Sequence, residues 1–148
     1  MKKNNKGFTL VELIVVLVIL AILAAILVPT LLGYIDQARS EKDFSTAQTV
    51  RVAAQAEIDQ MYGDSTTSTI ATFYGVIENG TATYGPKVIE LAGVGDKVTE
   101  FKFAYEKGII TTGYVVINGK NYQLQDNGQW KAVATKPTVT TPTAPATP

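Results

Sequence analysis

A single acidic side chain interrupts a long apolar run near the start of this 148-residue sequence. Residues 8–28 read FTLVELIVVLVILAILAAILV, and Glu12 is the only charged residue in this run. A helix of this length can span a bilayer. A carboxylate inside a bilayer costs about 2.5–3.5 kcal/mol on insertion scales, so it points to a function and needs a positively charged partner.

The residues before the apolar run offer a candidate for that partner. Residues 1–7, MKKNNKG, form a short basic leader that ends in Gly7. Cleavage after Gly7 would turn the nitrogen of Phe8 into a free amine, about one helical turn before Glu12. This new amine is therefore a candidate for the positively charged partner of Glu12.

This N-terminus resembles the precursor of a type IV pilin, type IVa-like, over about the first forty residues; the matching residues are Lys6, Gly7, Phe8, Thr9, Leu10, Glu12 and Pro29. The resemblance implies that a prepilin peptidase cuts between Gly7 and Phe8 and methylates the amine of Phe8. It implies a role for Glu12 in assembly of a helical homopolymer. It also implies a membrane platform and a cytoplasmic ATPase that extract the subunits from the membrane.

Two simpler interpretations compete with this one. A secretory signal peptide has an apolar stretch of only about 7–15 residues that ends at small residues, whereas this run is longer and continues into an amphipathic segment. A plain membrane anchor has no use for an acid near its start. If the apolar run lies in a membrane, Lys2, Lys3 and Lys6 predict that the N-terminus stays in the cytoplasm and that the rest of the chain lies outside.

A single helix from Phe8 to about Tyr62 is expected to carry Glu12, and it would be roughly 80 Å long at 1.5 Å per residue. Residues 8–28 would form its transmembrane or filament-core part, and residues 29–62 an amphipathic continuation. Pro29 and Gly33 predict a kink, because proline removes one hydrogen bond of the helix. The alternative is that the helix ends at Val28.

The continuation carries an apolar stripe with three- and four-residue spacing, made of Ala47, Val50, Ala54, Ile58 and Met61. This stripe is expected to pack against a sheet. Asp36, Arg39 and Asp43 precede it with the spacing of helical ion pairs. They are interpreted either as a solvated face or as charges that set the register between subunits.

The second part of the sequence predicts an antiparallel sheet, which makes the fold class α+β. An αβ-loop is expected over residues 63–98, with a short strand possible around residues 70–77 and a segment of uncertain type at 87–91. A meander of three or four strands should follow over residues 99–133, at 99–107, 112–117, 120–125 and 129–133. Asn118-Gly119 is the strongest hairpin signal among them.

The last fifteen residues, ATKPTVTTPTAPATP, are rich in threonine and proline. Residues 134–148 are expected to be extended and disordered, because such a composition cannot bury a core. Tracts of this kind can carry O-linked sugars, and the alternative is an unmodified spacer. The sequence has no cysteine, so the C-terminal disulfide of many pilins from Gram-negative bacteria cannot form; this favours a Gram-positive source.

The composition argues against catalysis and against ligand binding. The chain has no histidine and no cysteine, which removes most nucleophile–base pairs and most transition-metal sites. No cofactor and no metal are therefore expected, and an enzyme is not predicted. Loss of the leader would leave 10 basic against 13 acidic residues, and this mildly acidic balance argues against specific nucleic-acid binding.

Three functions remain open at this point. The first is a structural subunit of a type IV pilus, made as a single-pass precursor in the cytoplasmic membrane and assembled into an extracellular filament for adhesion, motility or DNA uptake. The second is a pseudopilin of a type II secretion or competence system. The third is a solitary anchored binding domain, which would need neither the Gly7-Phe8 junction nor Glu12.

Overall fold

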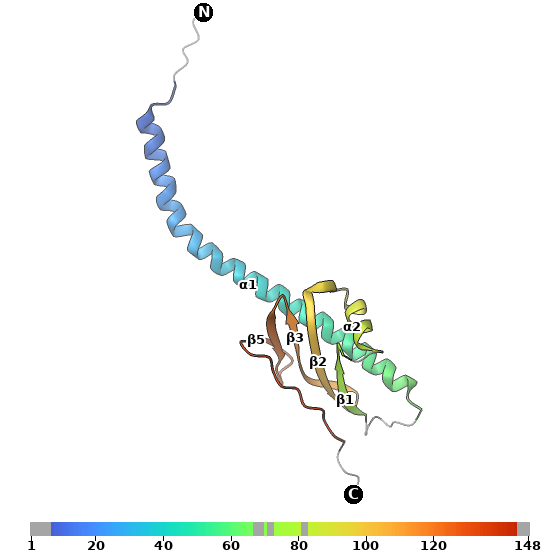
Figure 1. The fold of residues 1–148 in the computed structure, drawn as a ribbon. Coiled ribbons are helices and arrows are strands. Elements are labelled where there is room, and N and C mark those ends of the chain that lie inside the picture. The colour runs from blue at the N-terminus through green and yellow to red at the C-terminus, as the bar shows by residue number, and fades with distance from the viewer. Residues whose placement is uncertain (1–6, 67–69, 71–72, 81–82, 145–148) are drawn as a thin grey trace, which may run out of the picture. The chain divides into compact units, whose positions relative to one another are not determined.

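The computed structural model describes residues 7–66, 70, 73–80 and 83–144 of the chain. One long helix is followed by a five-stranded antiparallel sheet with the strand order β1-β2-β3-β4-β5 (Figure 1). The elements are α1 (Leu10–Asp64), β1 (Tyr74–Glu78), α2 (Gly85–Ala92), the short 3-10 helix η2 (Gly95–Lys97), β2 (Val98–Glu106), β3 (Ile109–Ile117), β4 (Lys120–Leu124) and β5 (Trp130–Val133). The predicted α+β class is confirmed.

The first helix has nearly the predicted bounds. It contains 55 residues and continues without a break through Pro29, so the alternative in which it ends at Val28 is wrong. The hydroxyl of Thr30 donates to the carbonyl of Leu27 at 2.8 Å beside this proline. By their contacts the residues fall into two units, Met1–Arg39 and Ser40–Pro148.

A meander of three or four strands was predicted over residues 99–133, with a short strand possible around residues 70–77; the sheet has five strands, and the possible short strand is β1. The additional strand, β1, lies inside the predicted loop 63–98 and pairs with β2 from Tyr74↔Glu106 to Glu78↔Lys102. It is short and contains Gly75, so its sequence signal is weak, and pairing with the longer β2 stabilises it. Within the same predicted loop, the segment of uncertain type at 87–91 belongs to α2.

Two hairpin turns have the same backbone conformation but different sequence signals. Asn118 and Gly119 have φ values of 52° and 77°, as expected for the two central residues of a type I′ turn. Lys107 and Gly108 have φ values of 51° and 77° between β2 and β3. Lysine is not a usual residue for this conformation, which explains why the sequence placed the start of β3 at 112 instead of Ile109.

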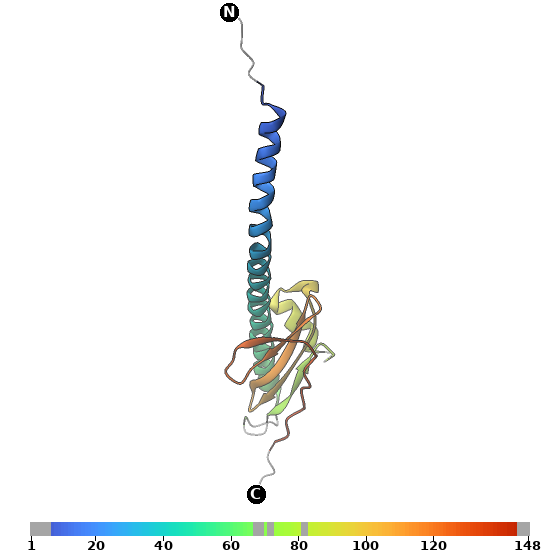
Figure 2. The same cartoon turned by 90° about the vertical axis from the view of Figure 1, so that its left-hand side faces the viewer.

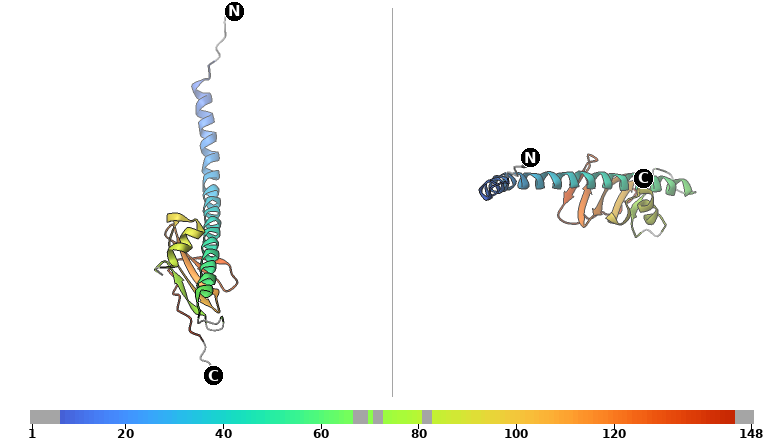
Figure 3. Two further views of the ribbon diagram at one scale, coloured as in Figure 1. Left: turned by 90° about the vertical axis from the view of Figure 1, so that its right-hand side faces the viewer. Right: turned by 90° about the horizontal axis from the view of Figure 1, so that it is seen from above.

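The core of the second unit lies between the sheet and the part of α1 that begins at Ser40. Figures 2 and 3 show that the strands lie on one side of this part of the helix. The predicted stripe is confirmed, because Ala47, Val50, Ala54 and Ile58 are fully buried and Met61 is partly buried against the same cluster. The largest side chains that the sheet adds to this cluster are Phe101, Phe103, Tyr105 and Tyr122.

An aromatic side chain faces a glycine at one central position of the sheet. Phe103 on β2 is paired with Gly113 on β3. A Cβ atom at Gly113 would lie 2.6 Å from the carbonyl oxygen of Lys102 and would also collide with the ring of Phe103. The glycine therefore leaves room for a core aromatic on the neighbouring strand, as in other sheets where an aromatic covers a glycine.

Polar side chains of α1 fix the position of the helix along the sheet. Gln55 donates to the carbonyl of Gly108 at 2.7 Å and accepts from the amide of Ile110 at 3.0 Å. Gln48 accepts from the indole nitrogen of Trp130 at 3.1 Å. These contacts reach different strands, so sliding the helix by one turn would break them together.

Asp43 corrects one prediction from the sequence. With Asp36 and Arg39 it was interpreted either as part of a solvated face or as a charge that sets the register between subunits. It is only 9% exposed, so the solvated face is wrong for Asp43. Its carboxylate accepts a hydrogen bond from the phenol of Tyr122 at 2.6 Å. Burial, and secondly this hydrogen bond, raises the pKa of Tyr122 above its ordinary value. Asp36 and Arg39 do form the expected ion pair, at 4.0 Å and with both side chains largely exposed.

The C-terminal segment, which was predicted to be extended and disordered, contains neither helix nor strand over residues 134–144. It is not separate from the domain, however, because Val139 is buried against the sheet and Lys136 forms an ion pair with Glu100. The sequence gave no sign of this contact, since proline and threonine predicted only an extended spacer. Residues 145–148 of the predicted tail lie outside the described residues.

Candidate functional site

The start of α1 is closed by reciprocal hydrogen bonds between Thr9 and Glu12. The amide and the hydroxyl of Thr9 each donate to the Glu12 carboxylate at 2.8 Å. The amide of Glu12 in turn donates to the hydroxyl of Thr9 at 3.3 Å. Thr9 is thus the N-cap and Glu12 the third helical residue of a capping box.

This arrangement gives Glu12 a local role in addition to the intermolecular one expected from the sequence. The first turns of a helix leave unpaired N–H groups and carry partial positive charge, which a carboxylate stabilises. The pattern Thr-x-x-Glu before an apolar run is a known signature of a helix N-terminus. Thr9 is therefore a site residue whose structural role could have been recognised from the sequence, although only the resemblance singled it out.

Gly7 and Phe8 lie just outside this capped helix end. Neither residue is helical, and the side chain of Phe8 is 82% exposed. Among the described residues, no atom beyond Gly7 and its two chain neighbours lies within 4 Å of the position that a Cβ on Gly7 would occupy. The peptide bond between them is therefore in open, non-helical chain, while the amide one residue further on, at Thr9, already contacts the Glu12 carboxylate. The leader residues 1–6, including Lys2, Lys3 and Lys6, lie outside the described residues.

The helix that follows Glu12 is apolar on all sides and exposed on all sides. The large apolar side chains from Leu13 to Val28 are all at least half exposed. An eighteen-residue window of α1 is long and apolar enough to cross a membrane, and none of this window is buried. Such a helix requires lipid or other apolar helices around it, because water would contact its whole apolar surface.

Pro29 and Gly33, the predicted kink residues, both lie within the continuous helix. Pro29 has no N–H to donate to the carbonyl of Ala25, so the helix lacks one hydrogen bond there. In the part of the chain that the structure describes, no atom beyond the two chain neighbours and the nearby helix backbone lies within 4 Å of the Cβ position of Gly33. The chain is therefore weakened at this place, and a kink stays a prediction.

The described residues offer no group of three or more Asp, Glu, His or Cys side chains that could hold a metal ion. The chemistry available at the N-terminus is thus that of a backbone nitrogen, a hydroxyl and a carboxylate. These groups can cap a helix and form an ion pair.

A family model, the prokaryotic N-terminal methylation motif, matches residues 2–28. The match begins in the basic leader, includes Gly7, Phe8, Thr9 and Glu12, and ends where the apolar run ends. No solved structure matches the chain. The segment 2–28 is the class III signal peptide of type IV pilins. At the start of an apolar helix, this motif indicates a protein of the type IV pilin or pseudopilin family.

Proposed function

We propose that this chain is the structural subunit of a type IV pilus, which polymerises through α1 into a surface filament. The observation that carries the proposal is the position of the Glu12 carboxylate. It lies at the capped start of a helix whose next sixteen residues are apolar and exposed. A carboxylate at this position fits a helix that lies first in lipid and later among other copies of the same helix.

Processing at the Gly7-Phe8 junction is the first step of the proposal. A prepilin peptidase would cut this peptide bond and methylate the new amine of Phe8. The exposed, non-helical chain at both residues supports access of a peptidase. Before the cut the precursor would lie in the cytoplasmic membrane with its leader inside, as the positive-inside rule predicts.

Pairing between copies is the second step. An α-amine has a reference pKa of about 7.7–8.0, so much of it is positively charged near neutral pH. A subunit that enters the filament would place this amine against Glu12 of a copy already assembled. A shift by one turn would leave both charges unpaired among apolar helices, where an unpaired charge is costly. The pair therefore sets the register, and apolar burial at about 25 cal/mol per Å² supplies most of the cohesion.

The capping box adds a condition to this step. In the isolated chain Glu12 already accepts two hydrogen bonds from Thr9. These bonds compensate the carboxylate while the helix lies in lipid, and a methylated amine adds a full positive charge that Thr9 does not provide. Glu12 is thus held at the start of its own helix by Thr9, the residue next to that chain's own amine at Phe8. The amine of a neighbouring copy would have to reach the carboxylate at this place.

Two variants of Glu12 test the proposal and separate the charge from the cap. Glu12→Gln keeps an acceptor suited to a capping box but removes the charge, and Glu12→Ala removes both. We expect both variants to be processed and inserted into the membrane, and neither to form filaments that can be sheared from cells. Normal filaments from Glu12→Gln would refute the charge pair.

Mass spectrometry of the mature chain tests the cleavage site. The expected mass is that of a chain beginning at methylated Phe8, and Gly7→Ala should leave the precursor uncut. An unchanged mature mass in Gly7→Ala would refute the site. A mature chain that keeps its leader would favour a solitary anchored domain instead.

The methylation motif also fits a pseudopilin of a type II secretion or competence system, which would have the same helix and a short filament. Sheared surface fibres composed of this chain would support the pilus. A secretion defect in a deletion strain without surface fibres would support the pseudopilin. In both cases we expect an assembly platform and an ATPase as partners, and adhesion, motility or DNA uptake as roles for a pilus.

A further inference from the structure

The sheet has a second apolar cluster on the face that points away from α1. Ala104 lies between Phe103 and Tyr105 on β2, and because side chains alternate along a strand it points to the opposite face from these core residues. Ala104, Tyr114 and Val139 form a buried cluster there, with Val76 and Val116 packed against it. One buried member, Val139, comes from the C-terminal segment.

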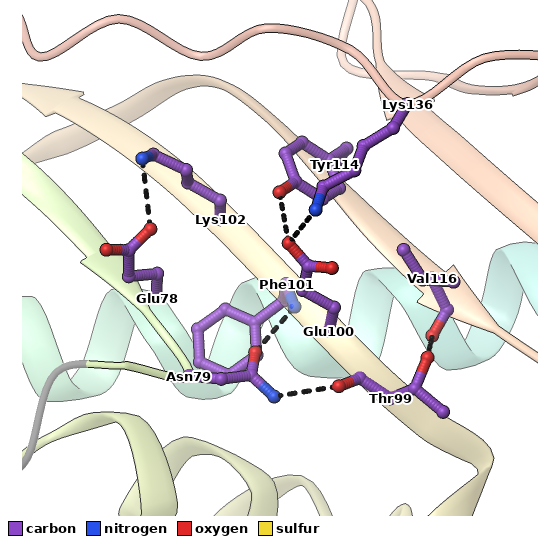
Figure 4. A network of polar contacts seen from close by, with 9 residues as sticks. All are labelled: Glu78, Asn79, Thr99, Glu100, Phe101, Lys102, Tyr114, Val116 and Lys136. Atoms are coloured by element: carbon purple, nitrogen blue, oxygen red, sulfur yellow. Dashed lines mark hydrogen bonds and ion pairs between the residues drawn. The ribbon is translucent and has the colours of Figure 1, made fainter.

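An ionic contact joins the same segment to the same face, three residues earlier in the chain. The carboxylate of Glu100 on β2 accepts a hydrogen bond from the phenol of Tyr114 at 2.6 Å. The same carboxylate forms an ion pair with the ammonium of Lys136 at 2.5 Å (Figure 4). The ammonium of Lys136 also lies 5.5 Å from the centre of the Tyr114 ring. One lysine of the C-terminal segment thus contacts two adjacent strands at once.

The segment presents its apolar side chains to the sheet and its threonines to solvent. Val139 is 9% exposed and Pro137 is half-buried, whereas Thr138 and Thr140 are exposed. The amide of Asn121 reaches the carbonyl of Ala134 at 3.5 Å, where the segment leaves β5. Residues 134–144 contain neither helix nor strand, so side chains hold them on the sheet instead of a ladder of backbone hydrogen bonds.

We propose that residues 134–144 are a detachable strap that occupies a peptide-binding site on the outer face of the sheet. Glu100 and Tyr114 bind the lysine of the strap, and the cluster around Ala104 receives the valine three residues later. The ligand of this site is an extended segment with that spacing of lysine and valine, here supplied by the chain itself. In a chain without cysteine, the strap fastens the outer face of β1–β3 without a covalent bond.

Thiol labelling tests whether the strap is bound in the full chain. Because the chain has no cysteine, Val139→Cys and Thr140→Cys each introduce a single thiol at neighbouring positions, one buried and one exposed. In detergent, a maleimide should modify the thiol at position 139 about tenfold more slowly than the thiol at 140, since access requires local opening. Adding Lys136→Met should accelerate labelling at 139 and leave labelling at 140 unchanged. Equal rates at 139 and 140 would overturn the proposal.

A peptide tests whether the face is a binding site in its own right. The probe is the fluorescently labelled peptide ATKPTVTTPTA, residues 134–144, added to a chain that ends at Val133. Removal of the strap leaves the cluster against α1 complete, because none of its members lies beyond Trp130. The native peptide should bind, and a peptide with Lys136→Met and Val139→Asp should not.

The two experiments distinguish their possible failures. If the truncated chain keeps its circular dichroism but does not bind the peptide, the binding site is refuted. If the truncated chain does not fold, the labelling rates decide alone, because they are measured in the full chain.

Discussion

The two halves of α1 contain similar apolar residues in opposite surroundings. In the first unit Ile22 is 58% exposed, and the apolar residues around it are exposed to a similar degree. In the second unit Ile58 is fully buried against the sheet. The apolar residues of the first half encircle the helix, whereas those of the second half follow one stripe.

This difference shows which part of the helix the chain itself can satisfy. A stripe about one face marks a helix whose partner is one surface, and here the sheet provides it. A helix that is apolar all round needs an apolar environment on every side, and the described residues leave the apolar window of α1 unburied. The second half therefore determines the stability of the domain, and the first half determines what the domain is attached to.

The largest effect on stability is expected from Ile58→Ala, for which Ile22→Ala is the matched control. Ile58→Ala removes buried methyl groups and leaves a cavity, which costs about 2–5 kcal/mol in other proteins. Ile22→Ala should leave the unfolding of the domain unchanged, because Ile22 is 58% exposed and belongs to neither buried cluster of the described residues. Both can be measured by thermal denaturation of the full chain in detergent.

The contrast between the two isoleucines should reverse in assembly. Ile22→Ala should reduce the yield of sheared fibres, since in the proposed filament that side chain would pack against other copies. A drop in melting temperature with Ile22→Ala as large as that with Ile58→Ala would contradict the separation of the helix into two parts.

The next largest effect concerns the two acidic residues that the sequence grouped together. Tyr122→Phe removes the donor to the buried Asp43 carboxylate, and loss of a hydrogen bond to a charged group costs about 1.5–3 kcal/mol. Arg39→Gln removes the exposed partner of Asp36 and should not change the melting temperature measurably. Equal melting temperatures for Tyr122→Phe and the wild-type chain would show that Asp43 does not depend on this bond.

Glu57 is an exception within the buried face of α1. It is 6% exposed, and one of its carboxylate oxygens has no hydrogen-bond partner in the described part of the chain. Replacing a buried charged group by an apolar one of similar size is often neutral or stabilising by about 1–4 kcal/mol. We expect Glu57→Met to unfold at a higher temperature than the wild-type chain. Destabilisation by this variant would indicate that the Glu57 carboxylate is paired in the folded protein.

Much of the fold could be predicted because periodicity and turn chemistry are local signals. Spacing alone identified the stripe from Ala47 to Met61, and the Asn118-Gly119 turn has the backbone that its residues favour. The β1 strand was predicted only as a possibility around residues 70–77, and the early start of β3 was missed, because pairing with β2 determines both. The burial of Asp43 was missed for a related reason, since its partner Tyr122 is 79 residues away in the chain.

The candidate site could be predicted in composition but not in geometry. Gly7, Phe8 and Glu12 were identified from one charge in an apolar run and from a glycine-aromatic junction. Their pattern did not show that Glu12 is held by Thr9 in the same chain, although the Thr-x-x-Glu spacing contains that information. The strap was also missed, because the extended conformation of a Thr/Pro segment leaves open whether its few apolar side chains find a partner.

The smallest effect is a pH dependence of the second unit that the first unit should not share. The hydrogen bond from Lys136, and secondly that from Tyr114, holds the pKa of Glu100 below its ordinary value of 4.5. A carboxyl whose folded pKa is lowered contributes stability that is fully present above its unfolded pKa, and that is lost as the pH falls through the folded pKa. The contribution of Glu100 should therefore be constant above about pH 4.5 and decline in more acidic solution.

Glu100→Gln should remove this part of the acid dependence. The difference in unfolding free energy between wild type and Glu100→Gln is expected to be below about 1 kcal/mol near neutral pH, because the Glu100 side chain is 38% exposed and solvent screens the ion pair. It should shrink further as the pH falls from about 4.5 to 3, where Glu100 becomes protonated in the wild type. Melting curves of both full chains in detergent over this range measure the difference. A difference that stays constant down to pH 3 would show that the carboxylate of Glu100 does not hold the strap, and the outer face would then depend on Val139 alone.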